Sequence, residues 1–159
     1  MNTERNGKKR YSIDSGLWAQ NLSQVYRFGS AYLSEKMKEY GLSAGSFPIV
    51  LFLADNGPSN LELIADALLV DKSLITRQIR NLLKKDLISI ASDTSDKRKK
   101  IAILTEFGKA IVPQIRKVLK TWGEEIFASL SREKQEVFFE ILEYSAEKTL
   151  SMYCKVREQ

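Results

Sequence analysis

The stretch "NLELIADALLVDKSLITRQIRNLLKK", residues 60–85, predicts two short helices joined by a tight turn. Asn60 is a good N-cap for the first helix, in which apolar side chains recur at helical spacing up to Leu68. Asp71 is a good N-cap for the second helix, which we expect to run from Lys72 to about Lys85. Two short helices joined in this way are a helix-turn-helix signal.

The two sides of the second helix differ in chemistry. Ile75, Ile79 and Leu82 cluster on one side when residues are placed at about 100° intervals. The opposite side holds only cationic and hydroxyl side chains, with Thr76 at the boundary: Ser73, Arg77, Arg80 and Lys84. A charged stripe is usually just a solvated face. Here it follows a helix-turn-helix spacing and precedes a basic hairpin, which favours a helix that reads DNA.

A β-hairpin with a charged tip is predicted after this helix. "LISIA" (87–91) and "KIAIL" (100–104) are rich in isoleucine and alternate as strands do. Their connection is rich in Asp, Ser, Thr and Lys, which is typical of a hairpin loop. Such a ribbon can carry Lys97 and Arg98 toward the neighbouring minor groove or its phosphates. The alternative interpretation is a mobile, solvated loop without a partner.

Two acidic residues in the same tip, Asp93 and Asp96, would repel DNA if their carboxylates were bare. We therefore expect them to orient the wing. Asp96 does so either by holding Arg98 or by pairing with an arginine of the preceding helix.

Amphipathic helices flank this central region. On the N-terminal side, residues 14–40 predict one long helix after a mobile arm at residues 1–13. Gly41 suits the C-terminal cap of that helix, and Ser43 suits the N-cap of the next, whose first turn tolerates Pro48.

On the C-terminal side, two further helices are predicted. Thr105 can cap a long helix, in which Pro113 should cause a bend or mark an early kink, because proline removes one backbone hydrogen bond and crowds the preceding turn. Ser131 can cap the last helix.

Composition restricts the class of protein. The 159 residues suffice for one well-cored domain, and neither a signal peptide nor a membrane-spanning segment is visible, so we expect a cytoplasmic protein that does not enter the membrane. Histidine is absent and Cys154 is the single cysteine, which argues against an enzyme, a metal site or an internal disulfide. Cys154 is either an ordinary thiol or a redox sensor. The sequence indicates no cofactor.

Positive charge is concentrated in the predicted DNA-reading region. The net charge is +5, and residues 72–100 hold nine basic side chains against three acidic ones. From Thr105 onward the charges cancel. A polyanionic partner is therefore consistent with the central segment.

Residues 57–111 as a whole resemble the MarR family of winged-helix transcription regulators, chiefly through "VDKSLITR", "DTSDKRKK" and "LTEFGKAI". The resemblance implies a mostly α fold with a small β-hairpin wing, spanning 1–159 as a single domain. In it, a winged helix-turn-helix lobe (44–104) is flanked by dimerisation helices (14–40 and 105–153).

The resemblance also implies the partners. These are a second copy of the chain and a double-stranded, pseudo-palindromic DNA operator, with the two reading helices about 34 Å apart in successive major grooves. The apolar residues of the flanking helices independently predict a partner chain, because a slim helical arm cannot bury them alone. The expected function is a sequence-specific transcriptional regulator, specifically a repressor. The alternative is a winged-helix module that binds protein and not DNA.

The expected DNA-contacting residues lie on the two helices and the wing. They are Asn60, Lys72, Ser73, Thr76, Arg77, Arg80, Lys97, Arg98 and Lys99. Two residues depart from the family pattern. Leu69 stands where the family often has a turn glycine, which implies a different turn or a strain of about 1 kcal/mol if φ is positive. Leu74 replaces a small polar residue, so base readout there is in doubt.

Many relatives bind a small aromatic or anionic effector in a crevice beside the DNA-binding lobe. The resemblance therefore implies a crevice lined by aromatic side chains, for which the candidates are Trp18, Tyr26, Tyr32, Tyr40 and Phe47. Aromatic residues at helical spacing are equally compatible with an ordinary core.

Overall fold

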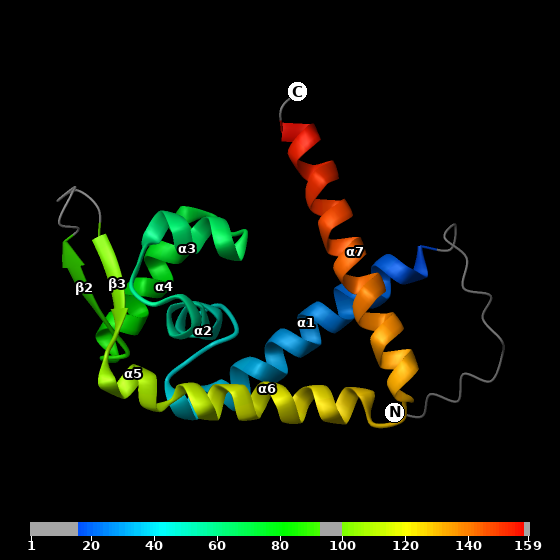
Figure 1. Ribbon diagram of the computed structural model, residues 1–159, viewed down its shortest axis with the longest axis horizontal. Coiled ribbons are helices and arrows are strands. Elements are labelled where there is room, and N and C mark those ends of the chain that lie inside the picture. Colours follow the sequence, from blue (N-terminus) through cyan, green and yellow to red (C-terminus); the bar gives the residue numbers. More distant parts are fainter. Residues whose placement is uncertain (1–15, 93–99, 158–159) are drawn as a thin grey trace. The chain divides into compact units, whose positions relative to one another are not determined.

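The computed structural model describes residues 16–92 and 100–157, which form two compact units (Figure 1). The first unit extends to Val118 and the second begins at Leu119. Within the described ranges, none of the helices combines the length and apolar character needed to cross a membrane.

The first unit contains the predicted winged helix-turn-helix. Its elements are α1 (Leu17–Met37), the 3-10 helix η2 (Lys38–Tyr40), α2 (Phe47–Asn56), β1 (Ser59–Asn60), α3 (Leu61–Leu68), α4 (Lys72–Lys84), β2 (Ile88–Ser92), β3 (Lys100–Leu104), α5 (Glu106–Ala110) and the start of α6 (Val112–Phe127). The structure confirms the predicted fold class, which is mostly helical with a small antiparallel sheet.

The start of α2 corrects one predicted cap. As expected, Gly41 adopts a left-handed conformation (φ 70°) after η2. The prediction that Ser43 caps the next helix is wrong, since α2 begins at Phe47, after Ser46. The Ser46 hydroxyl instead accepts a hydrogen bond from the Ser43 amide at 2.9 Å, so the extra residues form a turn. Pro48 lies in the first turn of α2, as predicted.

The wing is part of a three-stranded sheet with the order β1-β3-β2, and not a two-stranded ribbon. β2 and β3 pair antiparallel, with Ile90 opposite Ala102. The added strand β1 places Ser59 against the other edge of β3, also at Ala102. The segment just before α3 is thereby fixed to the base of the wing.

The predicted helix after Thr105 is divided in two. The Thr105 hydroxyl caps α5 by accepting a hydrogen bond from the Gly108 amide at 2.9 Å. α5 ends at Ala110 and α6 begins at Val112, so that Pro113 lies in the first turn of α6. Proline is tolerated in a first turn because the amides there have no partner within the helix. The predicted bend at Pro113 is therefore a break between helices.

The hydrophobic core lies in the first unit. All the buried apolar residues in the described part of the chain precede Val118. They include Ile75, Ile79 and Leu82 of α4, which confirms the predicted inward face of that helix. Burial of this face fixes the rotation of α4 about its axis, so the opposite face is directed outward.

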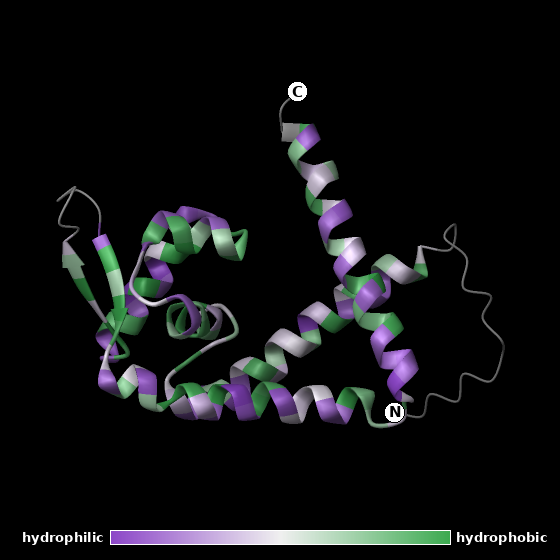
Figure 2. Ribbon diagram, in the orientation of Figure 1, coloured by the Kyte–Doolittle hydropathy of each residue, from purple (hydrophilic) through white to green (hydrophobic). Residues whose placement is uncertain are grey.

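The second unit holds the rest of α6 and the helix α7 (Arg132–Arg157). Phe127, Phe138 and Phe139 form an aromatic cluster with ring centroids 5.2–5.6 Å apart. Hydrogen bonds from the Ser131 hydroxyl and from the Glu133 amide lower the pKa of the Glu133 carboxyl. In Figure 2, polar and apolar residues alternate along α7, and none of its described side chains is fully buried.

Candidate nucleic-acid interface

The outward face of α4 carries cations that have no partner among the residues the structure describes. Ser73, Arg77 and Arg80 are exposed. Among the described residues, neither guanidinium makes an ion pair or a hydrogen bond. A guanidinium presents several donors in a rigid plane and suits phosphate or guanine acceptors. This face is therefore chemically equipped to bind a polyanion.

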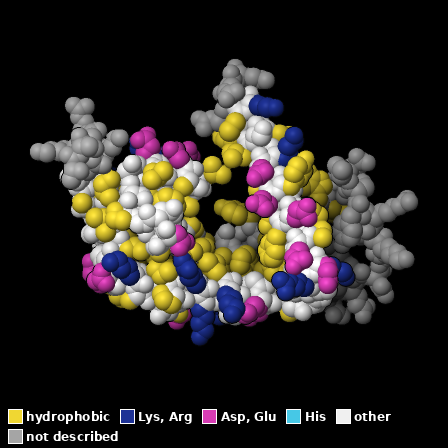
Figure 3. Space-filling view, viewed as in Figure 1, with side chains coloured by type: hydrophobic (Ala, Val, Ile, Leu, Met, Phe, Trp, Pro, Cys, Tyr) yellow, Lys and Arg dark blue, Asp and Glu magenta, His cyan; other side chains and the backbone are white. Residues whose placement is uncertain are grey.

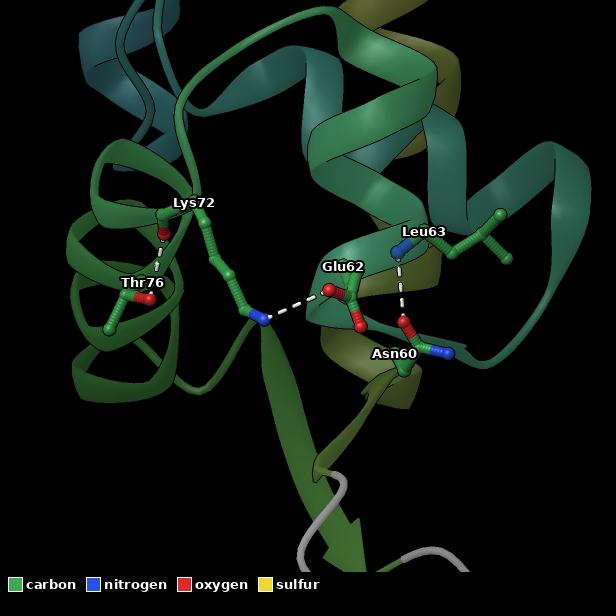
Figure 4. Close-up of polar contacts among 5 residues, drawn as sticks. All are labelled: Asn60, Glu62, Leu63, Lys72 and Thr76. Carbon is green, nitrogen blue, oxygen red and sulfur yellow. Dashed lines mark hydrogen bonds and ion pairs between the residues drawn. The ribbon is translucent and has the colours of Figure 1, made fainter.

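Lys72, at the start of α4, is held differently (Figure 4). Its ammonium nitrogen lies 3.2 Å from a carboxylate oxygen of Glu62, in the first turn of α3. The Thr76 hydroxyl donates to the Lys72 carbonyl at 2.8 Å and so retains only acceptor capacity for other partners. The ion pair links the two helices of the helix-turn-helix.

Asn60 has a structural role in addition to its predicted DNA contact. Its side-chain oxygen accepts a hydrogen bond from the Leu63 amide at 2.8 Å, which confirms the predicted cap of α3. Its backbone pairs with Ile101 in the sheet. Asp71 occupies the predicted N-cap position of α4, although its carboxylate makes no capping hydrogen bond.

The turn between α3 and α4 is strained at Leu69. This residue has φ 53° and ψ 44°, a left-handed conformation that non-glycine residues adopt at a cost. Its amide donates to the Asp66 carbonyl at 3.2 Å, and the following Val70 amide donates to the Ala65 carbonyl at 3.1 Å. Of the two alternatives expected at Leu69, a different turn or a strained positive φ, the structure has the positive φ.

The wing tip lies outside the described residues. This applies to all five of its predicted functional side chains: Asp93, Asp96, Lys97, Arg98 and Lys99. The final described pair of the hairpin is Ser92 with Lys100. The roles of the tip residues stay predictions.

The aromatic residues proposed for an effector crevice have different environments. Trp18 and Tyr26 on α1 are exposed, with 57% and 75% of their surface accessible. Tyr32 lies beneath the Lys36 ammonium, 5.6 Å from the ring centroid. Hydrogen bonding to Glu39 raises the pKa of the half-buried Tyr40, and Phe47 is also half-buried. A shared crevice stays a prediction.

A different hollow, of about 480 Å³, is lined by none of these aromatic residues. Its lining comes from α2, β3, α5 and α6 and includes Leu53, Ile103 and Val112. Two cations also line it: Lys109, paired with Glu106, and Arg116, paired with Asp55. Sequence reasoning missed this hollow because its walls come from segments more than forty residues apart along the chain.

Comparison with known proteins assigns this architecture to a family. The MarR family model matches residues 42–100, which include α2, the helix-turn-helix and β2 and end at the first residue of β3. The transcriptional regulator MhqR of Bacillus subtilis is 26% identical over 121 residues, which are 76% of this chain and 83% of MhqR. Both comparisons indicate a MarR family transcriptional regulator.

Solved structures of MarR proteins share this fold over most of its length. A MarR transcriptional regulator from Methanosarcina mazei Go1 has a TM-score of 0.80 and 29% identity, over 86% of this chain and 98% of that one. A MarR family regulator from Listeria monocytogenes, solved in complex with 26mer DNA, has a TM-score of 0.80 and 20% identity, over 89% and 94% of the two chains. The winged helix-turn-helix predicted from the sequence is thus the fold of these MarR proteins.

Proposed function

We propose that this MarR-family regulator binds double-stranded DNA through the outward face of α4 and represses transcription as a homodimer on a pseudo-palindromic operator. The observation that carries the proposal is the two-sided character of α4, which buries Ile75 and Ile79 and exposes Arg77 and Arg80, neither of them paired with another described residue. The major groove of DNA, about 12 Å wide, admits a helix of this kind. The DNA complex of the Listeria relative supports the same partner.

Position along α4 suggests a division of roles. Ser73, Thr76 and Arg77 lie in the first two turns and are proposed to reach base edges or phosphates at the groove edge. Arg80 lies a turn farther along and is proposed to bind the phosphate backbone. The wing residues Lys97 and Arg98 add contacts to the adjacent minor groove or its phosphates.

Homodimerisation is supported by apolar surface that the single chain leaves exposed. On α1 this surface includes Trp18, Leu22, Val25, Tyr26 and Phe28, and on α7 it includes Val137, Phe138, Phe139, Ile141, Leu142 and Tyr144. Figure 3 shows such side chains at the surface of α7, among acidic ones. Exposed apolar side chains in such number mark an interaction site, and a two-fold dimer is the commonest way to cover them.

We also propose that a small aromatic or anionic effector weakens DNA binding. The hollow beside α2 and α6 is within the size range of small-molecule sites and is mainly apolar, with Lys109 and Arg116 in its wall. Its occupant would contact both the DNA-binding lobe and the start of α6. The replacement Val112→Trp should fill the hollow and abolish release by an aromatic carboxylate, while DNA binding without the carboxylate persists.

The decisive experiment measures binding to a fluorescent random-sequence duplex as salt is raised. For about six phosphate contacts, the logarithm of the binding constant should fall against the logarithm of salt concentration with a slope near −5. Arg77→Ala should weaken binding and make the slope shallower by about 1. The control is Lys117→Ala, which removes a charge from an exposed position on α6. If the unchanged protein did not bind duplex DNA at low salt, the protein-binding alternative would be favoured.

A further inference from the structure

We propose that Glu62 is a positioning residue that lowers the sequence-independent affinity of the protein for DNA by holding Lys72 away from the phosphate backbone. This role replaces the DNA contact that the sequence suggested for Lys72. This inference rests on the proposed function, since it assigns a role within the same surface. Neither the predicted DNA contacts nor the capping of α3 uses the Glu62 carboxylate.

The geometry sets Lys72 apart from the arginines of α4. Its ammonium lies 3.2 Å from the Glu62 carboxylate, whereas Arg77 and Arg80 are unpaired among the described residues. Figure 4 shows the lysine side chain reaching from the first turn of α4 toward the start of α3. A phosphate approaching this ammonium would also meet the carboxylate, so the pair presents almost no net charge to the backbone.

The Glu62–Lys72 ion pair is exposed, so a single substitution can remove it without disturbing the fold. Both side chains are more than 60% exposed, at 62% for Lys72 and 63% for Glu62. Exposed pairs contribute little to folding, so removing the carboxylate should leave the fold intact. A freed lysine, by contrast, gains one phosphate contact, which adds about 0.9 to the magnitude of the salt slope.

Sequence-independent binding depends almost entirely on the attraction between protein cations and DNA phosphates. Such binding competes with operator binding at every other site on the genome. Neutralising one cation at the edge of the reading surface therefore favours discrimination. Arg77 and Arg80 retain the charge that operator binding requires.

The test compares salt slopes on a random-sequence duplex for four chains. Relative to the unchanged protein, Glu62→Gln should steepen the slope by about 0.9 and tighten binding three- to tenfold near 0.1 M salt. Lys72→Met should leave the slope unchanged, because the lysine makes no phosphate contact while paired. The double variant should restore the original slope.

Asp66→Asn is the matched control. It removes an exposed negative charge from the same helix, but Asp66 has no ion pair among the described residues, so the change releases no cation and should leave the slope unchanged.

Two results would overturn the role of Glu62 alone: an unchanged slope for Glu62→Gln, or a slope made shallower by about 0.9 in Lys72→Met. The second result would mean that Lys72 already contacts a phosphate. Failure of the unchanged protein to bind duplex DNA would overturn both this role and the proposed function. The two failures are therefore distinguishable.

Discussion

The Lys85 ammonium donates a hydrogen bond to the backbone carbonyl of Gly41, and this contact joins the end of α4 to the turn that follows η2. The aliphatic part of Lys85 also packs over Gly41, where an added Cβ would lie 3.1 Å from the lysine Cδ. Lys85 therefore anchors the proposed reading helix to the end of the N-terminal helical segment, 44 residues earlier.

Loss of the Lys85–Gly41 hydrogen bond should lower the free energy of unfolding. Lys85→Met keeps much of the aliphatic packing and removes the hydrogen bond, so we expect the free energy of unfolding to fall by about 1 kcal/mol. Lys84→Met is the control, because Lys84 is exposed and makes no hydrogen bond or ion pair among the described residues. Urea denaturation of both variants tests this. Equal stability of the two variants would show that the contact contributes nothing.

The strained turn at Leu69 predicts a stabilising substitution. Leu69 is 67% exposed and has a φ of 53°, so Leu69→Gly removes a conformational penalty and little buried surface. We expect the free energy of unfolding to rise by about 0.5 kcal/mol, after allowance for the greater flexibility of glycine in the unfolded chain. Val70→Gly, next to it, should have the opposite effect because Val70 does not have a positive φ. Thermal unfolding that ranked the two variants the other way round would contradict the strain argument.

Gly108 predicts a severe steric defect. A Cβ at this position would lie 2.0 Å from the Leu87 carbonyl oxygen, where α5 packs against the segment leading into β2. We expect Gly108→Ala to lower the free energy of unfolding by about 2–3 kcal/mol, because the backbone must move. Gly123→Ala in α6 meets no atom within 4 Å and should not destabilise the protein, since alanine favours helix. Calorimetry of the two variants measures their unfolding temperatures. The steric argument is contradicted if Gly108→Ala unfolds at the same temperature as the unchanged chain.

Alanine substitutions at the two N-cap positions of the helix-turn-helix should lower the free energy of unfolding by different amounts. Asn60→Ala removes the hydrogen bond to the Leu63 amide and should cost about 1 kcal/mol of unfolding free energy. Asp71→Ala removes no capping hydrogen bond and should cost only a few tenths of a kcal/mol. Chemical denaturation of both variants is the measurement. A larger loss in Asp71→Ala would mean that its carboxylate caps α4 in solution.

The sequence predicted the features that depend on local pattern. The inward face of α4 followed from the spacing of Ile75, Ile79 and Leu82, and the cap at Asn60 followed from residue type. β1 was not predicted, because two residues, Ser59 and Asn60, have no detectable periodicity and become a strand only by pairing with β3.

Features that depend on contacts between distant residues were also beyond sequence patterns. The Glu62–Lys72 pair spans ten residues and requires the turn geometry at Leu69, which amino-acid type alone does not specify. Likewise, the Ser43 cap failed because the residues before Phe47 form a turn closed by Ser46, an alternative that local propensity does not distinguish.

The number of chains bound to one selected DNA duplex tests the central proposal, a paired regulator with two α4 faces on adjacent turns of DNA. A duplex of about 30 base pairs, recovered by repeated selection from a random pool, should bind two chains in sedimentation velocity and show protection about 34 Å apart in footprinting. Arg77→Ala should weaken this complex without changing the two-chain stoichiometry of the free protein. A complex with one chain per duplex, or a selected pool with no two-fold related half-sites, would contradict the proposal.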